Sequence, residues 1–448
     1  MGFTKTIKNI WSVEDLRKRI GITLLLVIIY RFGCYVVLPG INPDELLALK
    51  NFTADGLMQL LDMFSGGAFS QASIFALGIM PYITASIVIQ LLGMVLPSFQ
   101  KMQREGESGR QKLNQYTRYL TVFILLLQAP AYLMNLTHQV NAVNGGASMG
   151  FWTIVYLTII LAAGSMFIMW LGERITDRGI GNGISFIILV GIIARLPEAM
   201  FFEFVSRLPG DGMAQGGLVM FLVEVVLLFA VTVGAVLLVQ GTRKVPVQYA
   251  KRIVGNKQYG GVRQYIPLKV NAAGVMPIIF AQAIMFVPIT LAGFGADESS
   301  SGFFAAFADI NGFWYNFVYF IMIVGFTYFY TAITVRPTQM AEDMKRNNGF
   351  IPGVKPGKKT AEYLDSIMSR ITLPGSLFLG IVAILPAFAR FFGISQNFAQ
   401  FFGGTSLLIM VGVVLDTLQQ IESHLMMHHY DGLMKDGKIK GRTTGSAY

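Results

Sequence analysis

The sequence is short of cysteine and of charge. Its single cysteine, Cys34, excludes an intramolecular disulfide, and we expect it to act as a small apolar residue inside the first helix. Charged residues make up 13% of the 448 residues, whereas ordinary soluble domains carry about 25%. Together with 54% hydrophobic residues and a mean hydropathy of +0.56, this excludes an ordinary soluble globular protein.

Signatures of enzymes are also scarce. His424 and His428 have the spacing of a metal-binding pair, but the stretch H-L-M-M-H lacks the glutamate of H-E-x-x-H, which favours a solvated tail. The run from Gly179 to Gly183 resembles a glycine-rich phosphate loop, yet no strand precedes it, so we expect a tight connection between two helices. The sequence predicts no catalytic residue, no metal and no cofactor.

Acidic residues are rare within the apolar stretches. Glu224 is a lone acid near the predicted outer end of its helix, where we expect it to reach the membrane interface. A secondary transporter would need coupling acids at mid-membrane, and an intramembrane protease would need a catalytic dyad or metal ligands inside a span. The sequence offers neither set, which disfavours both alternatives.

Long apolar stretches are abundant. A membrane-spanning helix needs ~20 apolar residues, and a barrel would show short alternating strands instead. We therefore predict an all-α polytopic membrane protein with ten transmembrane helices, at roughly 20–38, 74–96, 119–136, 152–171, 184–200, 217–239, 273–293, 313–335, 372–390 and 404–422.

The basic residues predict the topology. With a cytoplasmic N-terminus, all but five of the 35 Lys and Arg residues lie on the cytoplasmic side, the exceptions being Arg31, Lys50, Arg195, Arg207 and Arg390. Ten spans return the C-terminus to the cytoplasm. We expect an N-terminal half at 1–200, an inverted C-terminal half at 201–423 and a cytoplasmic tail at 424–448.

Two long cytoplasmic loops, 240–272 and 336–371, are strongly basic. Such charges either hold the protein against anionic lipids or dock an acidic partner or an RNA surface. Charges in the middle of a loop favour docking, because they project beyond the lipid headgroups. The candidate docking residues are Arg243, Lys244, Lys251, Arg252, Lys355, Lys358 and Lys359.

A semi-apolar half-helix with a Gly66-Gly67 hinge precedes the second span, at about 57–73. Irregular backbone at membrane depth must be buried in protein or line a cavity. The segment is therefore either a movable stopper or binding element, or a loop that dips into the headgroups.

Two isoleucine pairs, Ile79 with Ile83 and Ile184 with Ile188, each share one helix face. Such pairs serve as lipid or packing contacts, or as an apolar constriction that excludes water. Polar residues in the spans, among them Thr84, Gln128 and Asn271 at a span entrance, are typical of contacts between helices.

Eight separate motifs resemble the SecY family, the central subunit of the bacterial protein-translocation channel, over nearly the whole chain. They occur in the family's order. They are M-F-S-G-G-A (63–68), S-I-F-A-L-G-I-M-P-Y-I (73–83), E-G-E-S-G-R (105–110), Q-Y-T-R-Y (115–119), E-R-I-T-D-R-G-I-G-N-G-I-S (173–185), P-L-K-V-N (267–271), P-G-V-K-P-G (352–357) and F-G-G-T-S-L-L-I (402–409).

The resemblance implies two halves around a central hourglass pore. Its plug would include Met63, Phe64, Ser65, Gly66, Gly67 and Ala68. Its pore ring would be Ile79, Ile83, Ile184, Ile188, Ile279 and Ile409, in place of the lipid contacts that the pairs alone favour. A lateral gate between the second and seventh spans would carry a polar cluster of Thr84, Gln128 and Asn271.

The resemblance also implies a function and partners. Unfolded secretory chains would cross the membrane, and hydrophobic segments would leave sideways into the lipid of the inner membrane. The partners would be the small membrane subunits SecE and SecG, the SecA motor ATPase, the ribosome, signal peptides with nascent chains, and anionic lipids. The family commonly has Arg where this chain has Lys355, which keeps the charge but offers no planar fork for paired hydrogen bonds.

Overall fold

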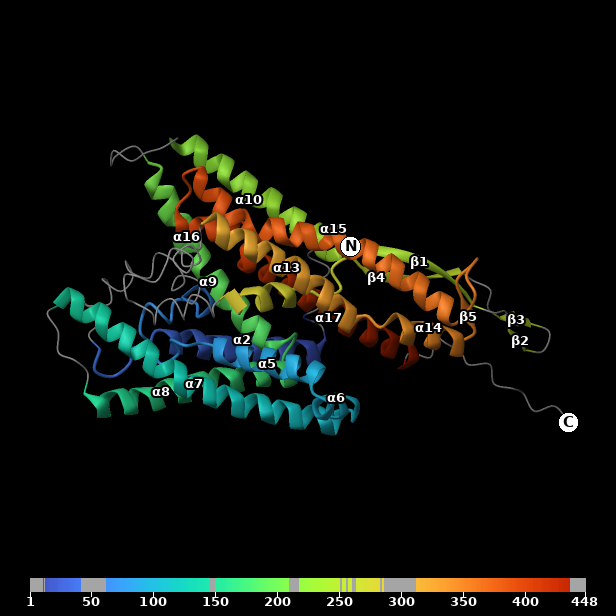
Figure 1. Ribbon diagram of the computed structural model, residues 1–448, viewed down its shortest axis with the longest axis horizontal. Coiled ribbons are helices and arrows are strands. Elements are labelled where there is room, and N and C mark those ends of the chain that lie inside the picture. Colours follow the sequence, from blue (N-terminus) through green and yellow to red (C-terminus); the bar gives the residue numbers. More distant parts are fainter. Residues whose placement is uncertain are drawn as a thin grey trace. The chain divides into compact units, whose positions relative to one another are not determined.

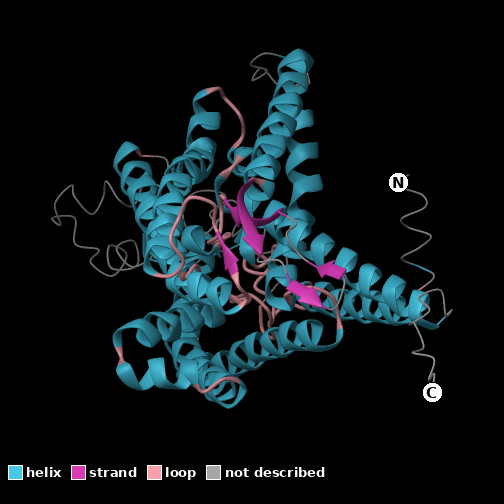
Figure 2. Cartoon of the chain, turned by 90° about the vertical axis from the view of Figure 1, so that its right-hand side faces the viewer, coloured by secondary structure: helices cyan, strands magenta, loops and turns pink. Residues whose placement is uncertain are grey.

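A computed structural model describes residues 11, 13–41, 62–144, 150–208, 217–249, 252–254, 257–259, 263–282, 284–285 and 312–435. Helices dominate this part of the chain (Figure 2). The helices are α2 (Glu14–Cys34), α5 (Met80–Val95), α6 (Pro97–Arg104), α7 (Glu107–Asn144), α8 (Phe151–Arg178), α9 (Gly183–Ser206), α10 (Gly217–Gln240), α13 (Phe313–Thr334), α14 (Pro337–Arg346), α15 (Lys358–Phe391), α16 (Gln396–Ala399), the 3-10 turn η2 (Gln400–Phe402) and α17 (Gly404–Lys435).

Each of the ten predicted spans overlaps a helix, the seventh through the helical residues 276–282. In the described residues, seven helical stretches are long and apolar enough to cross a membrane, or eight if the bent pair α5 and α6 forms one span. The helix α2 is not among them, because basic residues lie near both of its ends.

The second span begins later than the sequence suggests. Residues 65–79 form a series of turns, and α5 starts at Met80 with Pro81 in its first turn, a position that proline favours. Gly78 just before it has φ +56°, which ends any continuous helix from the preceding segment. Cys34 is the last residue of α2 and is buried, which confirms its predicted place.

The chain divides into two compact units, residues 1–195 with 413–448 and residues 196–412. In the first unit, a core cluster joins α7 and α8 to Leu38 and to residues 69–76, with Leu133, Leu161 and Phe69 among its members. In the second unit, α13 packs along α15 (Figure 1).

The two long basic loops fold together in the second unit. Strand β1 (Thr242–Tyr249) pairs antiparallel with β4 (Arg263–Lys269) and with β5 (Gly349–Phe350), in the order β4-β1-β5. A small second hairpin joins β2 (Arg252–Val254) to β3 (Lys257–Tyr259). The loop at 336–371 supplies α14, β5 and the start of α15 (Figure 1).

A shared apolar core holds these loops together. Val245 and Val247 of β1 and Leu268 of β4 pack against Met344 of α14 and Leu364 of α15. The sequence predicted charged loops here and no strands. The short alternation of buried Val245 and Val247 was the available signal, and it is hidden among basic residues.

Candidate functional site

The buried segment at residues 62–73, called the plug segment below, lies between α2, α7 and α9 of the first unit. Residues 62–64 form one helical turn, and turns follow. Met63, Phe64, Ser65 and Ala68 are all at most 6% exposed. The predicted residues 57–61 lie outside the described part. The plug segment is thus a tightly packed, irregular strip of backbone.

Glycine is required at the centre of the plug segment. Gly66 and Gly67 have φ values of +66° and +94°, which other residues rarely adopt. A Cβ atom at Gly66 would lie 2.8 Å from the Cα atom of Gly191 in α9 and 2.9 Å from a guanidinium nitrogen of Arg31. The two glycines therefore allow the plug backbone to touch the helix directly.

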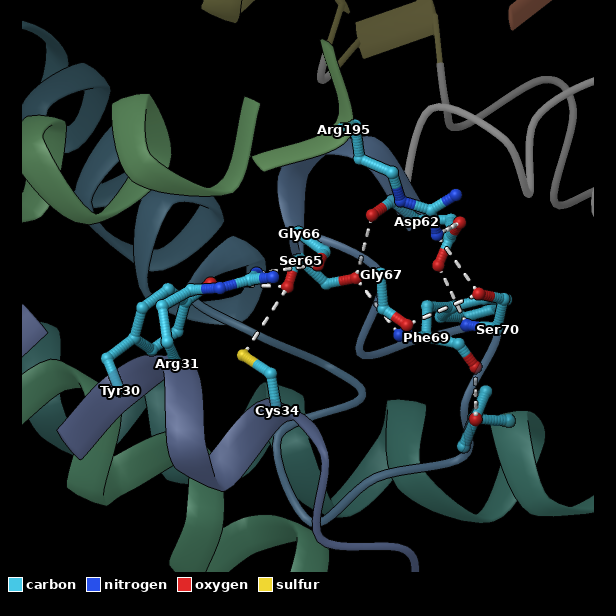
Figure 3. A network of polar contacts seen from close by, with 11 residues as sticks. Tyr30, Arg31, Cys34, Asp62, Ser65, Gly66, Gly67, Phe69, Ser70 and Arg195 are labelled. Atoms are coloured by element: carbon cyan, nitrogen blue, oxygen red, sulfur yellow. Dashed lines mark hydrogen bonds and ion pairs between the residues drawn. The ribbon is translucent and has the colours of Figure 1, made fainter. Parts of the chain in front are cut away.

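Three residues of α2 hold the plug segment from one side (Figure 3). Tyr30 Oη donates to the Ser65 carbonyl at 3.2 Å, and Arg31 Nη1 donates to the Gly66 carbonyl at 2.9 Å. The Cys34 thiol lies 3.9 Å from the same Ser65 carbonyl. These contacts satisfy carbonyls that have no partner in regular secondary structure.

An ion pair holds the plug segment from α9. Arg195 Nη2 pairs with the carboxylate of Asp62 and donates to Ser70 Oγ at 3.0 Å (Figure 3). Asp62 Oδ1 also accepts the Ser70 backbone N–H at 2.8 Å. From α7, Tyr132 Oη donates to the Phe69 carbonyl at 2.9 Å. Two of the five predicted outer basic residues, Arg31 and Arg195, thus fasten the plug segment.

The six predicted ring isoleucines are divided between the units. In the first unit, Ile79 and Ile83 lie at the start of α5, where the Ile83 N–H donates to the Ile79 carbonyl at 3.1 Å. Ile184 and Ile188 occupy the first turns of α9; Ile188 is buried, and Ile184 packs against Gly172 of α8. In the second unit, Ile279 is half-buried and Ile409 in α17 is 1% exposed.

Glu224 was wrongly expected to reach the membrane interface. It is 2% exposed and accepts a hydrogen bond of 2.7 Å from Arg207 Nη2, because that arginine follows α9 and points into the same buried corner of the second unit. Glu203 accepts from Arg207 Nε at 3.0 Å. A salt bridge, rather than contact with the interface, makes the burial of this acid tolerable.

Comparison with known proteins shows the family of this chain. The SecY family profile matches residues 73–418. The translocase subunit SecY of Mycobacterium tuberculosis is 42% identical over 446 residues, covering 94% of this chain and 97% of the relative. The chain belongs to the SecY family. The corresponding subunit of Halalkalibacterium halodurans is 43% identical, covering 96% of this chain and all of the relative.

The fold extends to remote channel structures. Sec61 in the canine ribosome-channel complex from the endoplasmic reticulum is 16% identical, with a TM-score of 0.57 over 91% of this chain and 92% of that one. At this identity the likeness concerns the fold. The two chains share the arrangement of their helices over nearly their whole lengths.

The residues that a SecY lateral gate would use lie in both units. Thr84 on α5 donates to the Met80 carbonyl at 3.1 Å, and Gln128 is exposed on α7. Asn271, in the second unit, is 6% exposed, and its side-chain oxygen has no hydrogen-bond partner in the described part of the chain. In the first unit, no hydrogen bond among the described residues joins the side chains of Thr84 and Gln128.

The candidate docking residues lie mostly on the folded loops. Arg243 and Lys244 are exposed on β1, and Lys355, Lys358 and Lys359 are exposed before and at the start of α15. Arg252 belongs to β2, and Lys251 lies outside the described residues.

The contacts that hold the plug segment could not be predicted from the sequence. Asp62 and Ser70 of this segment are far in sequence from Tyr132 and Arg195, and no motif joins them, so no spacing could pair them. One signal was present in the sequence: Arg195 is among the five basic residues that the predicted topology places on the outer side, where basic residues are rare. Glu203 and Arg207 were also detectable as a pair four residues apart.

Proposed function

We propose that this protein is the pore subunit of a protein translocase. It passes unfolded secretory polypeptides across the membrane and releases hydrophobic segments sideways into the bilayer. The observation that carries the proposal is the plug segment, a buried strip of irregular backbone fastened by side chains of three helices in a chain of the SecY family. The subunit itself is a channel and not an enzyme.

The two halves of the chain would surround the pore, with the six isoleucines as its narrowest ring. An apolar ring presents no specific contact to a passing polypeptide and disfavours water and ions when empty. Thr84, Gln128 and Asn271 would line the lateral gate. The buried oxygen of Asn271, which has no hydrogen-bond partner among the described residues, supports this, because a buried acceptor without a donor destabilises a permanently closed contact.

The folded basic loops would receive the partners, the SecA ATPase and the ribosome, which supply the energy for transport. In the register of β1 and β4, Lys244 lies opposite Pro267, and Tyr265 lies opposite Pro246. Exposed Lys244, Lys269 and Tyr265 therefore share the solvent face of the sheet. Basic and aromatic side chains on one face suit an RNA surface, and the canine relative in fold was solved in a ribosome-channel complex.

The start of α15 supports docking independently of the sheet. Lys358 and Lys359 are in its first turn, where no acidic residue is present. Positive charge is unfavourable at a helix N-terminus, where the peptide dipoles present their positive end. These lysines do not stabilise their helix, which favours a role in binding a partner.

The protein would lie in the inner membrane, with both termini in the cytoplasm and anionic lipids against its basic face. SecE and SecG would bind as small membrane subunits. This placement exposes the basic loops to SecA and the ribosome, and it places the plug segment towards the opposite side.

A stalled secretory precursor tests the central pore. With photo-crosslinking residues at Ile79 and Ile409, we expect the precursor to crosslink at both positions, because each belongs to the ring. Trp152, an exposed residue at the start of α8, serves as the lipid-facing control. Absence of crosslinks at both ring positions would contradict the proposed path of the polypeptide.

Charge reversal tests the docking surface. Replacing Lys355, Lys358 and Lys359 by glutamate is expected to weaken partner binding at least about tenfold, because each replacement turns attraction to phosphate or acidic groups into repulsion. Binding of purified ribosomes and of SecA to membrane vesicles is measured separately, at two salt concentrations. Reversal of the exposed Lys18, which pairs with Glu14 in α2, is the control. Unchanged binding of both partners would remove this loop from the docking site.

A further inference from the structure

Three charged side chains form a buried cluster in the second unit, called the anchor cluster below: Glu203, Arg207 and Glu224. Their side chains are 1%, 4% and 2% exposed. Arg207 bonds Glu203 at 3.0 Å through Nε and Glu224 at 2.7 Å through Nη2. Charges are buried at such cost only where each is paired and hydrogen-bonded.

The anchor cluster also holds the turn between α15 and α16. Arg207 Nη2 donates to the Gly393 carbonyl at 2.8 Å, and the Ser395 N–H donates to Glu203 Oε2 at 3.1 Å. Two backbone groups of this turn thus depend on side chains from the end of α9.

From this turn, a continuous packed path leads to Ile409. The Ala399 N–H donates to the Ser395 carbonyl at 2.8 Å, and Phe398 and Phe402 pack edge to face, both buried. Ser406 Oγ in α17 then donates back to the Gln400 carbonyl at 2.6 Å. Ile409 lies one turn further along the same helix.

We propose that Arg207 is a positioning residue, which through the turn at 393–395 fixes the start of α17 and hence the place of Ile409. The inference rests on the proposed function, in which Ile409 belongs to the pore ring. It gives the buried charge a purpose beyond folding, because hydrophobic residues of similar size would fill the corner without fastening the turn.

The charges of the anchor cluster predict unequal roles for its members. Two carboxylates face one guanidinium, and Glu224 Oε2 is buried without a hydrogen-bond partner in the described part of the chain. Glu224→Gln therefore leaves a balanced pair and both bonds to the turn, so its effect is expected to be small. Arg207→Met alone takes the guanidinium from two buried carboxylates and is a poor test, because uncompensated buried charge destabilises the whole fold.

The decisive variant replaces all three residues by methionine. Replacing a whole buried ion cluster by hydrophobic residues of similar volume is often neutral or stabilising, so this variant is expected to fold while the turn is untied. The full-length protein, with its partner subunits in native membranes, carries Cys34→Ala and Ile409→Cys. Without precursor, maleimide alkylation at position 409 is expected to be about tenfold faster than with the anchor cluster intact.

The matched control is Ile323→Cys in α13, a residue of the same unit that is 0% exposed. An unchanged rate at 409 overturns the proposal, and so does an equal acceleration at 323, because the whole unit would then have loosened. Ion leakage is measured in parallel on the same triple variant carrying Ile409. Faster alkylation at position 409 with unchanged ion leakage supports the positioning role of Arg207. That result would overturn the assignment of Ile409 to the pore ring instead.

Discussion

Replacing Arg195 by methionine is expected to open the resting channel to ions. The substitution leaves the carboxylate of Asp62, whose side chain is 6% exposed, without its guanidinium, and it removes the bond to Ser70. Breaking a fully buried pair costs about 3–5 kcal/mol, and the 26% exposure of Arg195 reduces this to about 2 kcal/mol. Because that free energy holds the plug segment in place, its loss should raise the open fraction about thirtyfold.

Ion flux through proteoliposomes without precursor measures this effect. Arg390→Met is the matched control, because Arg390 is also on the predicted outer side but is exposed at the end of α15. The double variant Asp62→Asn with Arg195→Met should recover part of the seal, because it also removes the buried negative charge that has lost its guanidinium. A tight seal in the single variant would mean that the ion pair does not hold the plug segment closed.

The second large effect is expected at the ring. Replacing Ile188 by serine should increase resting conductance severalfold, because a hydroxyl hydrates a constriction that excludes water only while it is apolar. Ile187, the residue before Ile188 in α9, is a closely matched control. Its side chain is also buried, at 1% exposed against 3% for Ile188, but it faces another direction of the helix.

Ile187→Ser and Ile188→Ser should destabilise the protein by similar amounts, about 3 kcal/mol, since each removes a comparable buried apolar group. Only the change at 188 should raise conductance. Equal leakage from both variants would indicate general loosening of α9 and would remove the argument for a ring at Ile188.

Much of the fold was predictable because its causes are local. A run of apolar residues long enough to cross a bilayer specifies a helix wherever it occurs, and each predicted span overlaps one. The tight connection at Gly179 to Gly183 was predicted for the same kind of reason, and it is a short turn between α8 and α9, with the Gly183 N–H bonded to Thr176 Oγ1 at 2.9 Å.

The sheet of β4, β1 and β5 was not predictable in this way. Strand β1 is stabilised by β4, and its apolar residues are covered by Met344 and Leu364, about a hundred residues away in the chain. The many basic residues of these loops suit the proposed docking of a partner. The few apolar residues that form the core of the loops lie scattered among them, so no long apolar pattern marks the strands.

The sequence by itself determined the membrane class, the ten helices, the predicted orientation and membership of the SecY family, because hydropathy, charge and motif order are properties of short stretches. Only the tertiary structure decided what the few arginines predicted on the outer side do. Arg31 and Arg195 fasten the plug segment, and Arg207 joins two acids to a distant turn. The physical reason is that a buried charge is stable only beside its partners, and these partners come together only when the helices have packed.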